Sequence, residues 1–173
     1  MNKSKGVTVW LTGLSGSGKT TIATELESLF KEKGFKVEKI DGDVLRETLS
    51  KDLGFSKEDR DTNVERSAFL AKTLNNHGVV AIVSLISPYR EKRDWARNYI
   101  ENFFEVYVNC PLGACEERDA KGLYIRARKG EIPDFTGISD RYEEPVNPEL
   151  TLDTKLLEPK ECALRIVKAL KII

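Results

Sequence analysis

The residues best suited to chemistry lie close to the start of the chain. Residues 13–20 read GLSGSGKT and satisfy the pattern G-x-x-x-x-G-K-[ST]. The glycines of this pattern let backbone N–H groups turn inward around an anion, and a helix that starts there adds the positive end of its dipole. We therefore expect the exposed charge of Lys19 to reach the β- and γ-phosphates of a nucleotide, and the Thr20 hydroxyl to ligate Mg²⁺. The candidate phosphate-binding residues are Gly13, Ser15, Gly16, Ser17, Gly18, Lys19, Thr20 and Thr21.

The segments on either side of this loop support the interpretation. Residues 7–12, VTVWLT, are rich in β-branched and aromatic side chains and predict a buried parallel strand. Apolar residues at helical spacing follow the loop, and Gly34 stands where a helix would be capped. A glycine-rich turn that merely caps a helix is the alternative, and the agreement of strand, loop and helix disfavours it. The apolar residues of that helix are Ile22, Leu26, Leu29 and Phe30.

Two carboxylates, Asp41 and Asp43, follow a second predicted strand at residues 36–40. Open α/β sheets bind ligands at the C-terminal edge of their strands, so we expect both side chains to lie near the phosphate loop. A polar turn at the end of a strand is the alternative interpretation.

The rest of the chain alternates between helix and strand patterns. Helices are predicted at residues 58–76, around Trp95 and near the C-terminus, and strands at residues 79–83, 104–108 and 150–152. Such alternation implies right-handed βαβ units. We predict an α/β fold: a single three-layer P-loop nucleoside-triphosphate-binding domain over residues 1–173, with a mainly parallel central sheet flanked by helices and a basic lid.

Composition excludes several classes of protein. The chain has 173 residues, with 28 Lys plus Arg and 28 Asp plus Glu, so no basic surplus indicates nucleic acid or an anionic membrane. Its three cysteines, at positions 110, 115 and 162, lack the spacing of a zinc site, and we expect reduced thiols. With neither a signal peptide nor a membrane-spanning run, a cytoplasmic protein is expected. His77 precedes Gly78 at a predicted helix end, which indicates a structural role.

Residues 118–145 differ in character from the rest. They mix basic residues with Gly122, Gly130, Pro133 and Gly137. On a phosphate-binding domain, a glycine-punctuated basic segment suggests a mobile lid that closes over an anionic substrate and excludes water. A solvated surface loop explains the same composition equally well.

A phosphate loop alone leaves kinase, GTPase, ATPase motor and nucleotide sensor open. The sequence contains no N-K-x-D guanine signature, and a chain of 173 residues leaves little room for motor machinery. A small-molecule kinase fits best.

Several further segments carry a resemblance to a known family. In order, they are residues 13–21, 41–43 (DGD), 52–56 (DLGFS), 58–60 (EDR) with Asn63, 84–90 (SLISPYR), 118–124 (RDAKGLY) and 135–138 (FTGI). Together they closely resemble adenylyl-sulfate kinases over residues 6–148. The resemblance implies Mg²⁺-dependent transfer of the ATP γ-phosphoryl group to the 3′-hydroxyl of adenosine 5′-phosphosulfate, in sulfate activation. It also suggests that the protein forms a homodimer and that a sulfurylase is a candidate partner.

The resemblance assigns roles to individual residues. Asp43 matches the carboxylate that faces the acceptor hydroxyl, and Asp41 is expected to help hold Mg²⁺ through water. Phe55 and Phe135 match aromatics that sandwich the substrate adenine, although core packing is an alternative for each. For Phe135, the polar sequence around it makes a core role less natural. Residues matching nucleotide or substrate contacts are Arg118 for the nucleotide, and Arg46, Arg60, Asn63, Ile86, Ser87, Lys121 and Leu123 for the sulfate substrate.

Ser87 matches a serine described in some relatives as a phosphorylated intermediate. No activating base stands near it in the sequence, so we predict direct transfer, with Ser87 as a binding or loop-shaping residue. Pro88 favours an extended conformation there, and Arg90 is expected to add positive charge to the substrate site.

Two alternative functions remain at this stage. One is a P-loop kinase for another small hydroxyl acceptor, which the acceptor motifs disfavour. The other is a catalytically silent nucleotide-binding regulatory module, since relatives fused to sulfurylases can lose activity. Intact Lys19, Thr20 and Asp43 argue for an active enzyme.

Overall fold

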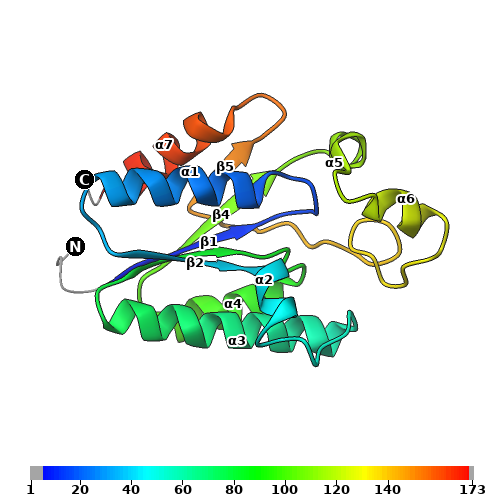
Figure 1. Cartoon of the computed structure of the whole chain (residues 1–173), viewed down its shortest axis with the longest axis horizontal. Helices are drawn as coiled ribbons and strands as arrows, with labels where there is room; N and C mark the ends of the chain where they lie inside the picture. The colour runs from blue at the N-terminus through cyan, green and yellow to red at the C-terminus, as the bar shows by residue number, and fades with distance from the viewer. Residues whose placement is uncertain (1–5, 172–173) are drawn as a thin grey trace.

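The computed structural model describes residues 6–171. Within them, a five-stranded, all-parallel sheet has the order β2-β3-β1-β4-β5. Helices α1 and α7 cover one face of the sheet and α3 and α4 cover the other, which makes three layers (Figure 1). The strands are β1 (Thr8–Thr12), β2 (Val37–Asp41), β3 (Val80–Ser84), β4 (Phe103–Asn109) and β5 (Leu150–Asp153). The predicted fold class and all five predicted strands are confirmed.

Alternating side chains of the central strand, β1, pack into two separate apolar cores on opposite faces of the sheet. Val9 and Leu11 are buried against α1 (Lys19–Glu32) and α7 (Pro159–Leu170), whereas Trp10 is buried against α3 (Lys57–Asn76) and α4 (Arg90–Tyr99). Because β1 and β3 are buried on both faces, their sequences read as continuous apolar runs rather than as alternating patterns.

The long helices begin and end close to where the sequence predicts. Gly34 follows α1 with φ +79°, a conformation that glycine adopts without strain. Ser56 caps α3 by accepting a hydrogen bond from the Asp59 N–H at 3.1 Å; at the other end His77 is the C-terminal cap residue, and Gly78 follows it with φ +71°, the glycine stop that was predicted. No helix within residues 6–171 is long and apolar enough to cross a membrane.

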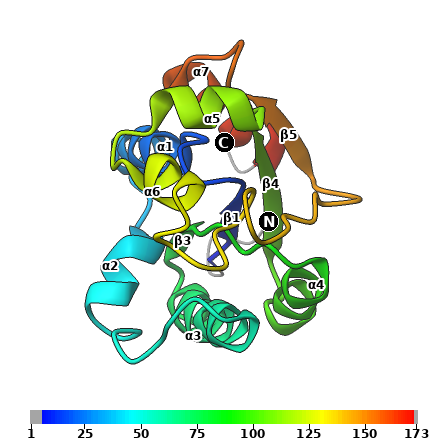
Figure 2. The same ribbon diagram turned by 90° about the vertical axis from the view of Figure 1, so that its right-hand side faces the viewer.

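Short helices surround the C-terminal edge of the sheet and were not predicted. They are α2 (Gly42–Glu47), α5 (Leu112–Arg118) and α6 (Leu123–Arg128), and Figure 2 looks onto this edge with α5 and α6 in front. A third apolar cluster under α6 includes Cys110, Cys115, Tyr124, Ala127 and Phe135. All three cysteines of the chain are buried free thiols, as predicted.

Candidate active site

A cavity of about 1030 Å³ lies at the carboxyl edge of the sheet. The phosphate loop, the start of α2, the β3–α4 connection and the segment around α6 all line it. Because parallel strands deliver their C-terminal loops to one edge, residues far apart in the sequence meet here. The predicted residues that line the cavity are Ser15, Gly16, Gly18, Lys19, Thr20, Thr21, Asp41, Asp43, Arg46, Phe55, Arg60, Asn63, Ile86, Ser87, Arg118, Lys121, Leu123 and Phe135.

Two loop residues support the phosphate site from behind rather than lining it. Gly13 has φ +154°, and a Cβ there would lie 2.5 Å from the Val108 carbonyl oxygen, so only glycine fits. Ser17 is fully buried, and its carbonyl accepts a hydrogen bond from the Thr154 hydroxyl at 2.8 Å. These contacts fix the loop against β4 and the connection after β5.

Lys19 is buried, and the expectation of an exposed charge was wrong. Its side chain is 8% exposed, and Nζ donates to the carbonyls of Gly13 at 2.9 Å and Leu14 at 2.6 Å. Burial lowers the pKa of Lys19 to about 8, because the desolvated amine loses hydration in its charged form. The amine thus supports its own loop.

The predicted magnesium residues lie together. The Thr20 hydroxyl donates to Asp41 Oδ2 at 2.9 Å, and Asp41 Oδ1 accepts from the Asp43 N–H at 2.9 Å, which caps α2. Hydroxyl and carboxylate oxygens suit Mg²⁺, which is usually held by one or two side chains together with substrate phosphates. Residues 6–171 contain no group of three or more His, Cys, Asp or Glu that could form an all-protein metal cage. The donor set therefore fits a metal that arrives with a nucleotide.

Asp43 forms an ion pair with Lys121 across the cavity. Both side chains are largely exposed, and the carboxylate raises the pKa of Lys121 through this hydrogen bond. The pair links the first turn of α2 to the basic segment around α6. The ion pair therefore places a carboxylate and an ammonium group side by side in the cavity.

An aromatic ring and two guanidinium groups form one cluster further along α2. Arg46 lies with Cζ 4.4 Å from the centroid of Phe55, and Arg60 lies 5.7 Å from it. Arg60 also donates from Nε to the Phe55 carbonyl at 2.9 Å. Phe55 is 53% exposed, so its ring is available to a ligand rather than committed to a core. Two cations beside an open aromatic face suit an anionic nucleotide.

Two buried polar atoms in the cavity wall lack a partner within residues 6–171. Asn63 Oδ1 and Thr136 Oγ1 make no hydrogen bond in this part of the chain, although both residues line the cavity and are at most 5% exposed. Buried polar groups are normally satisfied, so a ligand is the natural partner for both. Asn63 was predicted to bind substrate, whereas Thr136 was missed; its place directly after Phe135 was the available signal.

Phe135 contacts both the cavity and an apolar cluster. It lines the cavity, yet it is 8% exposed and packs edge-to-face on Tyr124 with ring centroids 5.0 Å apart. The expectation that its polar segment makes a core role unnatural was therefore wrong, because α6 brings its own apolar residues. Tyr124 in turn donates to the Ser15 carbonyl at 2.8 Å, which connects this cluster to the phosphate loop.

Ser87 has a left-handed backbone, and the expected extended conformation was wrong. Its φ is +41°, although Pro88 follows. The Ser87 hydroxyl accepts a hydrogen bond from Trp10 Nε1 at 3.1 Å, and the residue is 4% exposed. Arg90 was also misplaced: it does not line the cavity, and its Nε donates to the Glu144 carbonyl at 2.7 Å.

The predicted lid, residues 118–145, divides into two parts. Residues 118–139 contain α6 and line the cavity, with Arg118 donating from Nη2 to the Thr154 carbonyl at 2.6 Å. Residues 140–144 form an anchored strap on the β3–α4 connection. There Tyr89 donates to Asp140 Oδ2 at 2.6 Å, and the Glu143 N–H donates to the Pro88 carbonyl at 2.9 Å.

Residues 5–153 match the family described as adenylylsulphate kinase. The chain belongs to this family. It is 54% identical over 171 residues to "Adenylyl-sulfate kinase" from Halothermothrix orenii, covering 99% of this chain and 92% of the relative. It is 55% identical over 169 residues to the protein of that name from Rippkaea orientalis, covering 98% and 93%. The Mycobacterium tuberculosis APS kinase CysC, solved in complex with AMPPNP and APS, superposes with a TM-score of 0.93 at 44% identity, covering 96% of this chain and 98% of that one.

Proposed function

We propose that this protein is an ATP-dependent adenylyl-sulfate kinase. It transfers the γ-phosphoryl group of ATP to the 3′-hydroxyl of adenosine 5′-phosphosulfate, giving 3′-phosphoadenosine 5′-phosphosulfate and ADP. One observation carries the proposal besides family membership. Along α2, Asp41 contacts the phosphate-loop residue Thr20, Asp43 follows in the first turn, and Arg46 stacks on Phe55. A donor site and an acceptor site therefore meet in one cavity with a carboxylate between them.

Asp43 is the proposed catalytic base. Its carboxylate accepts the proton of the 3′-hydroxyl as the oxygen attacks the γ-phosphorus, and Lys121 pairs with it in the absence of substrate. Lys19 leaves the carbonyls of its own loop and stabilises the charge on the transferred group. Mg²⁺ held near Thr20, and by Asp41 through water, would neutralise charge on the β- and γ-phosphoryl oxygens.

The acceptor half of the cavity holds the sulfated nucleotide. We assign the adenine to the space between Phe55 and Phe135, and the anionic groups to Arg46 and Arg60. Asn63 supplies an unpartnered oxygen for a donor of the substrate. Ile86, Ser87, Lys121 and Leu123 complete this wall, and we assign Arg118, which also lines the cavity, to the nucleotide.

Transfer is direct in this proposal. The Ser87 hydroxyl accepts a hydrogen bond from the Trp10 indole, which is a donor only, so this partner cannot activate serine as a nucleophile. Ser87 therefore shapes the loop and does not carry the phosphoryl group.

The protein is further proposed to act in the cytoplasm as a homodimer, with a sulfurylase as its associated enzyme. Light scattering coupled to gel filtration tests the dimer, because a monomer elutes with the 19.5 kDa mass of one chain. Co-elution with a sulfurylase tests the association.

The decisive assay couples ADP release to a spectroscopic readout, with Mg²⁺ and ATP present and adenosine 5′-phosphosulfate added or withheld. ADP release that depends on this acceptor supports the proposal. Release with a different hydroxyl acceptor favours another small-molecule kinase. Nucleotide binding without any turnover favours a silent regulatory module.

A further inference from the structure

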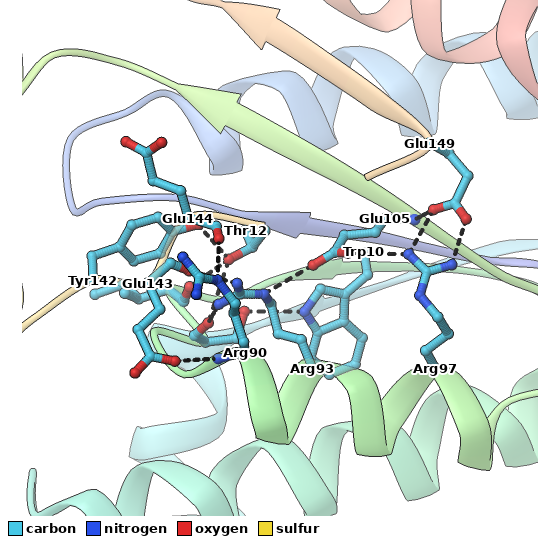
Figure 3. A network of polar contacts seen from close by, with 12 residues as sticks. Trp10, Thr12, Arg90, Arg93, Arg97, Glu105, Tyr142, Glu143, Glu144 and Glu149 are labelled. Carbon is cyan, nitrogen blue, oxygen red and sulfur yellow. Dashed lines mark hydrogen bonds and ion pairs between the residues drawn. The ribbon is translucent and has the colours of Figure 1, made fainter. Parts of the chain in front are cut away.

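A fully buried arginine stands beneath the acceptor wall of the cavity. Arg93, in the first turn of α4, is 2% exposed. Each of its three guanidinium nitrogens has a different partner: Nε donates to Glu105 Oε1 at 2.9 Å, Nη1 to the Ser87 carbonyl at 2.6 Å, and Nη2 to the Glu143 carbonyl at 2.5 Å. Figure 3 shows this guanidinium among residues of β1, β4, α4 and the strap at residues 140–144.

The three contacts serve two purposes that can be separated. The Glu105 carboxylate, itself 5% exposed, neutralises the buried charge of Arg93. The two carbonyl contacts need no charge pairing; they need a planar group whose donors point in fixed, diverging directions. Lysine could supply the charge at this position, but its single nitrogen could not span the same three partners.

One of these carbonyls belongs to the strained residue of the site. Ser87 combines φ +41° with a following proline, and such conformations persist only where the surroundings impose them. Trp10 Nε1 holds the Ser87 hydroxyl, and Arg93 holds the Ser87 carbonyl. The Thr12 hydroxyl holds the preceding carbonyl, that of Ile86, at 2.7 Å. The backbone of this wall is therefore determined from beneath by side chains that do not line the cavity.

The other carbonyl belongs to the anchored strap. The Glu143 carbonyl accepts a hydrogen bond from Arg93 Nη2. The ring centroid of the neighbouring Tyr142 lies 5.7 Å from the guanidinium carbon. The Tyr142 hydroxyl is 2.9 Å from Thr12 Oγ1, so the strap and the Ile86–Ser87 wall share partners on β1. One guanidinium thus joins the wall of the cavity to the segment that follows the lid.

We propose that Arg93 is a positioning residue for the acceptor substrate: by bridging Ser87 and Glu143 it holds the left-handed Ser87 turn and the base of the lid in the geometry that binds adenosine 5′-phosphosulfate. The assignment of the acceptor rests on the proposed function. Arg93 touches no substrate itself. Its loss weakens acceptor binding and leaves the nucleotide site intact, because the phosphate loop is held by other contacts, from Lys19, Tyr124 and Thr154.

The chain offers a matched control on the same helix. Arg97 shares the Glu105 carboxylate, with Nη2 to Oε2 at 3.0 Å, and also pairs with Glu149. It contacts neither Ser87 nor residues 140–144 in the described structure. If Arg93 acted only through the ion network around Glu105, Arg93→Lys and Arg97→Lys would affect the acceptor KM and the Trp10 resonance alike.

The test measures steady-state kinetics and the indole N–H resonances of ¹⁵N-labelled protein. Arg93→Lys is expected to raise the acceptor KM by about tenfold, the loss of one buried hydrogen bond, while the KM for ATP stays within about twofold. Trp10 and Trp95 are the two tryptophans, so the Trp10 indole resonance, which reports the bond to Ser87, is resolvable and is expected to shift. Arg97→Lys is expected to change neither acceptor KM nor the Trp10 resonance.

A second variant covers the case in which Arg93→Lys does not fold. The double substitution Arg93→Met, Glu105→Met removes the buried pair together, a change that such pairs often tolerate, and is expected to give the same acceptor KM and Trp10 shift. An unchanged acceptor KM in a folded Arg93 variant, or an equal rise in Arg97→Lys, overturns the proposal. Unfolding of both Arg93 variants also counts against it, because Arg93 would then be a stability residue. If wild-type protein shows no turnover, the proposed function fails, and the Trp10 resonance alone decides whether Arg93 holds Ser87.

Discussion

The two halves of the cavity are built in different ways. The nucleotide half is centred on one continuous stretch, residues 13–20, to which Asp41 and Arg118 are added, and its Lys19 bonds to carbonyls of the same loop. The acceptor half is assembled from separate segments around Asp43, Phe55, Asn63 and Ser87, with residues 121–135. A local half can be recognised from a motif, whereas an assembled half depends on contacts between distant parts of the chain.

Lys19→Ala is expected to have the largest effect, because it removes the only side-chain cation of the phosphate loop. Turnover is predicted to fall by about 10³-fold, the scale associated with losing a group that stabilises the transferred charge. The fold is expected to survive, since burial of the charged amine costs free energy that the substitution recovers. The measurements are kcat and thermal unfolding, with Lys39→Ala, a lysine paired with Glu27 on the surface, as control. Normal turnover in Lys19→Ala would remove the phosphate-loop assignment.

Asp43→Asn tests the carboxylate between the two halves. The single-turnover rate is predicted to fall by about 10²-fold, because asparagine cannot accept the proton of the acceptor hydroxyl. The affinity for ATP should stay close to that of wild type, as Asp43 does not contact the phosphate loop through its side chain. Glu47→Gln, an exposed carboxylate on the same helix, is the control. An unchanged single-turnover rate would deny Asp43 the role of base.

Hydrogen exchange sharpens the division between the lid and the strap. With ATP analogue and acceptor both bound, exchange in residues 118–139 is predicted to slow by about tenfold, because closure protects their amides. The Glu143 amide should already be protected in the free protein, because it bonds to the Pro88 carbonyl. Equal exchange of residues 118–139 in the free and bound states would count against a closing lid.

The smallest predicted effect is the uptake of protons by Lys19 when nucleotide binds. The pKa of Lys19 is about 8 in the empty site, and bound phosphates raise it, so nucleotide binding at pH 8 is predicted to take up about half a proton. Affinity should therefore fall as the pH rises from 8 towards the pKa of the bound state. In the free protein, between pH 8 and the ordinary lysine pKa of 10.5, the unfolded state binds more protons, so stability against unfolding rises with pH. Calorimetry in two buffers of different ionisation enthalpy measures the uptake, which Lys19→Ala should abolish.

The same contrast explains what the sequence could predict. The strands, the long helices and the phosphate loop follow from local patterns, and the predicted acceptor residues do line one cavity. The conformation of Ser87 could not be predicted, because buried side chains of β1 and α4 impose it against the preference set by Pro88. Burial of Lys19 was missed because its partners are carbonyls, which no sequence pattern reports.

The strap was missed for a related reason. Residues 140–144 share the polar composition of the lid, and only their contacts with Tyr89, Arg90 and Arg93 separate them from it. Likewise, Arg90 carries a charge suited to a substrate site, yet its backbone N–H and its side chain donate hydrogen bonds to the strap. Composition predicts which segment is basic, and only packing shows that residues 140–144 are anchored.

The central claim is that the two halves exchange a phosphoryl group in one direct step. The most direct measurement uses ATP made chiral at the γ-phosphorus with sulfur and oxygen isotopes, and determines the configuration of the thiophosphoryl group on the 3′-oxygen of the product. A single in-line transfer inverts the configuration, and inversion is the predicted result, with Ser87→Ala retaining substantial activity. Retention of configuration would require two successive transfers, and would contradict both the direct step and the loop-shaping role of Ser87.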